Sequence, residues 1–255
     1  MTRTRNTDLA VLAMVAASVG GMATSAMAID LTYTGVQSLG TYRVSMPTNI
    51  EKHVFAGRMS FAISASSDPR FATGSSIFTF CTDLDQSAVG SPRTYEFYSN
   101  LDDTPAGDRG IDDLPTPGSP PMGMAKAQAV SALYQSRFFE AISGDSLKAS
   151  AFQLALWEIV FEPASGTGLG TLDLSSGEGT FRVTQGDASA TGLAQQWLDE
   201  IAGMTLGPVS DQLIGFGSSI AQDQITIIPI PLPGAAAMAA IGLTGGAIAH
   251  RRFRS

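Results

Sequence analysis

The stretch ASAFQLALWEIVF, residues Ala149–Phe161, is a nearly continuous apolar run in the middle of the chain. Asp145 precedes it and can cap the N-terminus of a helix with its side chain. Pro163 follows it and stops a helix, because proline lacks the backbone N–H and clashes with the preceding turn. The sequence therefore predicts a helix from Asp145 to Glu162 around which the rest of the fold is arranged.

One polar residue lies on the apolar side of this expected helix. Lys148, Glu158 and Glu162 share one arc of the helical wheel, whereas Gln153 lies in the opposite arc among apolar residues. A buried amide without a partner costs roughly 1–3 kcal/mol. We therefore expect another group to satisfy or consume the Gln153 side chain, and the only cysteine, Cys81, is the candidate.

The N-terminal segment, residues 1–28, has the three parts of a secretory signal peptide. It starts with the basic residues Arg3 and Arg5, continues with the apolar run Leu9–Met22, and ends in an A-x-A cleavage site at Ala28. The apolar run is short for a membrane span. The sequence therefore predicts cleavage after Ala28 and export of the rest of the chain.

The C-terminal segment, residues 229–255, has a different pattern. Residues 234–249 are uncharged, apolar and small, and a basic tail, residues 250–255, follows them. A span needs about 20 apolar residues, which this run approaches when the preceding Pro-Leu-Pro is added. Arginines at such an end stay on the cytoplasmic side. The segment predicts a transmembrane helix with a proline motif before it (Pro231, Leu232, Pro233) and arginines behind it (Arg251, Arg252, Arg254).

This order of parts resembles the PEP-CTERM sorting signal of Gram-negative bacteria in its VPLPA-type variant. The match covers the sorting motif Pro231-Leu232-Pro233, the apolar helix and the basic tail, and no other part of the chain. The resemblance implies transient recognition by an exosortase, a membrane enzyme. It also implies passage through the inner membrane and delivery to the cell surface or extracellular matrix.

The body between the two ends, residues 29–228, has the length of one domain. Removing the ends takes away five of the 15 basic residues and one of the 23 acidic ones, which leaves 10 basic against 22 acidic, a net charge of −12. Such a surface repels nucleic acid and anionic lipid. We expect no nucleic-acid partner, and contact with the membrane only through the C-terminal helix.

Part of the acidic charge is concentrated in residues 101–114, with the sequence LDDTPAGDRGIDDL. Its composition and the PTPGSPP after it are typical of a loop. The loop lacks the ligand spacing and closing glutamate of an EF-hand. Solubility outside the cell and binding of a divalent cation remain the two interpretations of this charge.

Hydrophobic periodicity predicts strands first and helices later, with a few short strands after the helices. This pattern favours an α+β fold, in which an antiparallel β-sheet or sandwich layer carries a helical insertion. The expected strands are 31–46, 54–64, 76–84, a strand around 95–98, 180–184, 213–216 and 224–228, and the expected helices are 122–142, 145–162 and 187–203.

The body contains few of the residues that enzymes need. No HExxH, Walker loop, GxSxG or CxxC motif occurs, and the chain has too few ligands for a zinc site. A Cys81–His53 dyad and a carboxylate pair of Asp83 and Asp85 for glycoside hydrolysis are conceivable. An isolated histidine is more often a surface residue, and aspartates two apart at a strand end more often cap a turn. We therefore predict a protein that is not an enzyme and needs no cofactor.

Cys81 allows two interpretations. A lone cysteine in an exported protein has no internal disulfide partner, and a buried thiol can simply be a small hydrophobic side chain. Alternatively, its thiolate could attack the Gln153 side-chain carbonyl and expel ammonia, which leaves an internal thioester. A thioester is an activated acyl group that reacts once with an amine or a hydroxyl.

The residues around this pair resemble bacterial Cys-Gln thioester domains of cell-surface adhesins. Those domains carry an aromatic-Cys element early and a Thr-Gln-x-Ala-x-Trp element on a later helix. Phe80-Cys81 matches the first element and Gln153-Leu154-Ala155-Leu156-Trp157 the second, with Phe152 in place of the threonine. The resemblance implies a cross-link between Cys81 and Gln153, shielded from water by Trp157.

Together these patterns predict an exported protein of the surface or matrix. It is either adhesive, through a thioester that reacts with surface amines or polysaccharide, or a purely structural component without thioester chemistry. A secreted hydrolase using Asp83 or Asp85 has little support in the sequence.

Overall fold

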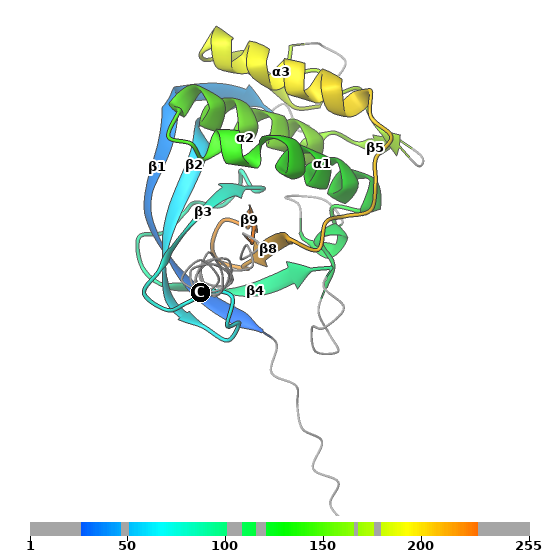
Figure 1. Cartoon of the computed structure of the whole chain (residues 1–255). Coiled ribbons are helices and arrows are strands. Elements are labelled where there is room, and N and C mark those ends of the chain that lie inside the picture. The colour runs from blue at the N-terminus through cyan, green and yellow to red at the C-terminus, as the bar shows by residue number, and fades with distance from the viewer. Residues whose placement is uncertain are drawn as a thin grey trace, which may run out of the picture.

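The structure, a computed structural model, describes residues 27–46, 51–100, 109–115, 121–165, 168–175 and 180–228. Within this part of the chain lie a seven-stranded antiparallel sheet and three α-helices, which confirms the α+β class (Figure 1). Most of the predicted signal peptide, residues 1–26, and the whole predicted sorting segment, residues 229–255, lie outside the described residues.

The strands follow the predicted order, with ends that differ by a few residues. The first two are much longer than an average strand of about five or six residues. The strands of the main sheet are β1 (Ala28–Ser45), β2 (Glu51–Ser66), β3 (Ser76–Cys81), β4 (Arg93–Ser99), β7 (Arg182–Gln185), β8 (Leu213–Gly217) and β9 (Gln224–Ile227), and a separate pair is formed by β5 (Ala164–Ser165) and β6 (Gly168–Leu169).

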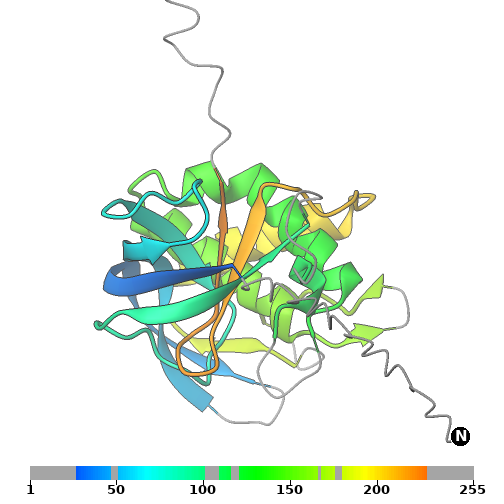
Figure 2. The ribbon, with the colours of Figure 1, turned by 90° about the horizontal axis from the view of Figure 1, so that it is seen from below.

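The main sheet closes on itself. Its strand order is β2-β3-β9-β8-β4-β1-β7, and β1 also pairs with β2. Ile29 shows the closure, because it pairs with Ser66 of β2 on one edge and with Tyr95 of β4 on the other. Six strands therefore form a ring, and β7 extends the far end of β1 (Figure 2).

Register shifts let the two long strands bend around this ring. One shift lies between Ser38 and Thr41 of β1. Opposite it, Gly57 of β2 approaches β1 so closely that an added Cβ would lie 2.1 Å from the Gln37 carbonyl oxygen. Only glycine fits such a backbone contact without a shift.

Two of the three helices begin directly after an aspartate at which the sequence predicts a helix start. The Asp145 side chain accepts a hydrogen bond from the Leu147 N–H at the start of α2, and Asp187 accepts one from the Ala190 N–H at the start of α3. Both bonds satisfy an N–H that lacks a partner within the helix. The three helices are α1 (Met124–Ala141), α2 (Ser146–Phe161) and α3 (Ala188–Ala202).

The helix α2 is the centre of the molecule. It packs between α1 and α3 and also against β1 and β2, and the three helices lie together on one side of the sheet (Figure 1). Every residue from Ala149 to Phe161 is buried. The polar arc expected from the sequence is not solvent-exposed throughout. Glu158 is fully buried and Glu162 is only 5% exposed, because the segment before β7 covers that side.

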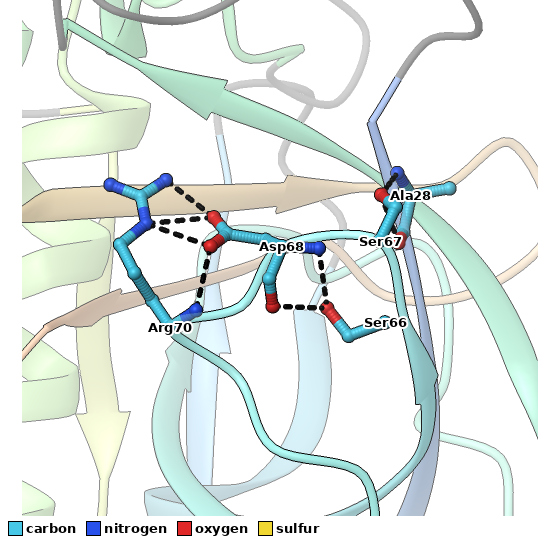
Figure 3. A network of polar contacts seen from close by, with 5 residues as sticks. All are labelled: Ala28, Ser66, Ser67, Asp68 and Arg70. Atoms are coloured by element: carbon cyan, nitrogen blue, oxygen red, sulfur yellow. Dashed lines mark hydrogen bonds and ion pairs between the residues drawn. The ribbon is translucent and has the colours of Figure 1, made fainter.

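The start of β1 is hydrogen-bonded to the turn after β2 (Figure 3). The Ala28 carbonyl accepts hydrogen bonds from the backbone N–H and the hydroxyl of Ser67, both at 3.0 Å. Next to it, buried Asp68 accepts two hydrogen bonds from the Arg70 Nε at 2.8 and 2.9 Å. Cleavage after Ala28 stays a prediction, and it would leave Ile29, a residue paired on both edges, as the first residue.

None of the helices in the described part of the chain is long and apolar enough to span a membrane. The transmembrane helix expected at residues 234–249 falls outside that part.

Candidate functional site

Cys81 and Gln153 lie in contact at the junction of β3 and α2. The Cys81 N–H donates to the Gln153 Oε1 at 3.0 Å, and the Gln153 Nε2 donates to the Cys81 carbonyl at 2.8 Å. The Cys81 Sγ lies 3.6 Å from the same Oε1. The contact between Gln153 and Cys81 that the sequence predicts is present, whereas the covalent bond stays a prediction.

Aromatic side chains pack together where β3 meets α2. Cys81 is the last residue of β3, and the preceding Phe80 packs on Phe152 with ring centroids 4.3 Å apart. Tyr134 of α1 meets Phe152 edge-on at 4.9 Å, and its hydroxyl donates to the Ile225 carbonyl of β9. Phe152 therefore occupies the threonine position of the thioester-domain pattern because it fills the core beside Gln153.

The electrostatics of the site oppose a free thiolate. Burial raises the pKa of the Cys81 thiol well above its usual range, and the carboxyl of Asp83 raises it further. The indole N–H of Trp157 acts in the opposite direction, because it lies close enough to the sulfur to favour the charged form. This N–H has no hydrogen-bond partner of ordinary geometry among the described residues, although Trp157 is only 1% exposed.

A pocket of about 390 Å³ opens over this site. Cys81 and Trp157 form part of its lining, and the space is large enough for a small ligand. Gln153 itself is fully buried behind them. The rest of the lining comes from β1, β2, the loop after β3 and the turn before β9 (Tyr33, Val36, Lys52, His53, Val54, Phe55, Met59, Leu84, Gln86, Ser87, Ala88, Gln222).

The geometry holds the Gln153 carboxamide next to the Cys81 sulfur. A backbone N–H already donates to Oε1, the oxygen on which negative charge would develop, and such a donor stabilises an oxyanion. The amide nitrogen that would leave is held by the Cys81 carbonyl. The arrangement therefore orients the carboxamide beside the sulfur without any further residue.

The other residues that the sequence singled out have structural roles. Asp83 accepts hydrogen bonds from the N–H groups of Asp85 and Gln86, so it caps the turn after β3 as the alternative interpretation predicts. His53 lines the same pocket as Cys81, but its Nε2 accepts a hydrogen bond from the Arg43 Nε at 3.3 Å. No hydrogen bond joins the side chains of His53 and Cys81, both of which the structure describes.

A buried acidic group next to Trp157 escaped the sequence interpretation. Glu158 accepts a hydrogen bond from the Asp173 N–H through Oε1, while Oε2 has no partner among the described residues. Burial, followed by the nearby carboxyls of Glu162 and Asp173, raises the pKa of Glu158 to about 8. The sequence feature that could have indicated its burial is the position of this glutamate within a nearly continuous apolar helix.

Asp223 is a second buried carboxyl that the sequence interpretation missed. Burial raises its pKa to about 7, with a further contribution from Asp83. Its Oδ1 accepts a hydrogen bond from the Ser218 N–H. Its position in the turn before β9 gave no sequence signal of burial.

Several predicted features fall outside the described residues. These are the sorting motif, the basic tail and residues 101–108 of the acidic loop. In the described part of that loop, Ile111–Asp113 forms a short 3-10 helix. Across the described ranges, no three His, Cys, Asp or Glu side chains gather as a metal site would require.

Comparison of the chain with protein-family models, with curated proteins and with solved structures finds no match.

Proposed function

We propose that this chain is an exported protein, sorted to the cell surface or extracellular matrix, whose body carries an internal Cys81–Gln153 thioester and adheres through it. The signal-peptide pattern of residues 1–28 and the PEP-CTERM-like pattern of residues 229–255 support export and sorting by an exosortase. Because each thioester reacts once, its role is attachment and not turnover.

The single observation that carries the thioester is the two-point pairing of the Gln153 carboxamide with the Cys81 backbone. It places the Sγ beside the amide and aims a donor at the carbonyl oxygen. In the reaction, a bond forms between Sγ and the side-chain carbonyl carbon and the carbon–nitrogen bond breaks. The thiol proton leaves with the amide nitrogen as ammonia, so no oxidant or cofactor is needed.

A purely structural role is the second candidate, and a specific observation favours it. Both polar atoms of the Gln153 carboxamide already have partners, so its burial costs little without a covalent bond. The raised pKa of Cys81 also keeps its thiol protonated and inert at neutral pH. In this role the two residues hold α2 against β3 and do no chemistry.

Intact mass of the purified body separates the two candidates. A protein with the thioester is lighter by one ammonia, takes up methylamine, and exposes an alkylatable Cys81 only after that uptake. Cys81→Ala should abolish methylamine uptake and restore the ammonia mass, and Gln153→Ala should expose a free thiol. A wild-type protein with full mass and no methylamine uptake, folded and with an intact Cys81, establishes the structural role instead.

A further inference from the structure

The pocket over Cys81 has a lining whose charge is unsuited to an ammonium ion. Its lining contains Lys52 and His53 but no aspartate or glutamate. The carboxylate of Asp85, which contacts Lys52 at 2.5 Å, is already paired with that cation. A protonated lysine side chain entering this pocket would find no free carboxylate among the lining residues.

Two buried polar atoms of the lining residues, one donor and one acceptor, have no hydrogen-bond partner of ordinary geometry among the described residues. The donor is the indole N–H of Trp157, and the acceptor is the buried Oε1 of Gln86. A hydroxyl can both donate and accept a hydrogen bond, whereas an ammonium can only donate.

The rim of the pocket adds an exposed aromatic face. Phe55 of β2 is 59% exposed although it is a large apolar residue, and half-buried Tyr33 of β1 lines the same space. An exposed aromatic ring beside amide and hydroxyl groups can cover the apolar face of a sugar ring. The amide and hydroxyl groups are those of Gln86, Ser87 and Gln222.

We infer that the pocket admits a neutral carbohydrate and that a sugar hydroxyl, not an amine, is the group that the site acylates. The inference rests on the thioester of the proposed function and names the class of its target. The hydroxyl oxygen forms a bond with the Gln153 side-chain carbonyl carbon as the carbon–sulfur bond breaks. The hydroxyl proton passes to the sulfur, which yields a glutamyl ester and the free Cys81 thiol.

The test compares two nucleophiles on the purified body, with intact mass as the readout. One is the neutral oligosaccharide maltohexaose, and the other is a short uncharged peptide with one lysine at the same concentration. We expect a maltohexaose adduct on the Gln153 peptide that hydroxylamine removes, as it removes an ester. We expect this adduct to form faster than the lysine adduct, although an amine is the stronger nucleophile.

Variants of two exposed phenylalanines supply the matched control. Phe55→Ala should slow the maltohexaose adduct about fivefold or more relative to labelling by methylamine, because only the sugar needs the aromatic ring. Phe139→Ala, at a 65% exposed residue of α1 outside the pocket lining, should change neither reaction.

The outcomes separate the target class from the thioester itself. Labelling by methylamine without a maltohexaose adduct, or a maltohexaose adduct that is insensitive to Phe55→Ala, overturns the carbohydrate inference and keeps the thioester. A full-mass protein that reacts with neither reagent overturns both proposals.

Discussion

At the scale of single residues, Gln153 shows how a buried amide can be accommodated next to a strand end. Its side chain uses one acceptor and one donor to pair with the backbone of Cys81, as a neighbouring strand would. The sequence identified the pair from two oddities, a glutamine on an apolar helix face and a lone cysteine. It could not identify the backbone pairing, because that depends on the register of α2 against β3.

This pairing predicts that Gln153→Ala is more destabilising than Cys81→Ala. The first change leaves a buried N–H and C=O unpaired and opens a cavity, which should cost about 2–5 kcal/mol in the free energy of unfolding. The second change keeps both backbone groups paired and should cost about 1–2 kcal/mol. Urea unfolding in the presence of a reductant measures the difference.

Gln195 of α3 is the matched control for this comparison. Its amide also pairs with backbone groups, accepting from the Leu174 N–H and donating to the Leu172 carbonyl, but it is only partly buried. Water can replace the lost bonds there, so Gln195→Ala should cost less than Gln153→Ala. Equal costs would contradict the role of the buried pairing.

The buried carboxyl of Glu158 predicts that stability falls as pH rises. Its pKa of about 8 in the folded protein lies above its ordinary 4.5, so the folded state holds the proton more tightly than the unfolded chain. Its contribution is therefore complete below about pH 4.5 and is lost progressively up to about pH 8. The loss should be roughly 2–4 kcal/mol for a group so deeply buried.

Urea unfolding of the wild type and of Glu158→Gln at about pH 5 and about pH 8.5 tests this expectation. The variant should lose less stability over that interval, because its neutral amide does not titrate. Asp223, with its pKa raised to about 7, contributes a loss of the same sign to both proteins. Equal losses in the two proteins would show that Glu158 is not the titrating group.

At the scale of elements, α2 owes its position to being apolar on nearly all sides. A surface helix shows one apolar stripe, whereas this helix is covered by α1, α3 and the strands. A neighbouring helix also satisfies a backbone carbonyl in the last turn of α2. Buried Lys126 of α1 donates a hydrogen bond to the Val160 carbonyl at 2.7 Å. The sequence predicted the bounds of α2 well, since caps and proline are local signals.

The cap of α2 predicts a measurable cost for its removal. Asp145→Ala loses the bond to the Leu147 N–H and should lower the free energy of unfolding by about 1 kcal/mol. Asp145→Asn keeps a capping oxygen and serves as the control, with little expected loss. If both variants unfold like the wild type, the cap contributes nothing to stability.

At the scale of the whole molecule, the strand ring and the helices that pack on it lie within residues 28–227. The strand ring starts at Ala28 and ends with β9 at Ile227, so the predicted sorting segment follows the last strand directly. The body should therefore fold without that segment. This separation lets the location of the protein be tested independently of its fold.

Deletion of Pro231–Ser255 should convert the protein from a surface- or matrix-associated form into a soluble one in the periplasm or medium. The reason is that the apolar run and the basic tail are the features expected to hold it at the membrane for sorting. Cell fractionation with detection of the body measures the change. A variant with Arg251, Arg252 and Arg254 changed to Gln isolates the basic tail, and a truncated chain that still fractionates with membrane or matrix contradicts the sorting proposal.

The features that can be predicted from the amino-acid sequence alone are local: the three helices, the cap at Asp145, the approximate strands, and the pairing of two unusual residues. These rest on capping, periodicity and proline, which act over a few residues. Closure of the sheet through Ile29, burial of Glu158 and the pocket over Cys81 arise only in the tertiary structure. They depend on contacts between segments far apart in the chain, and whether a charged side chain is covered is decided by the element that packs over it.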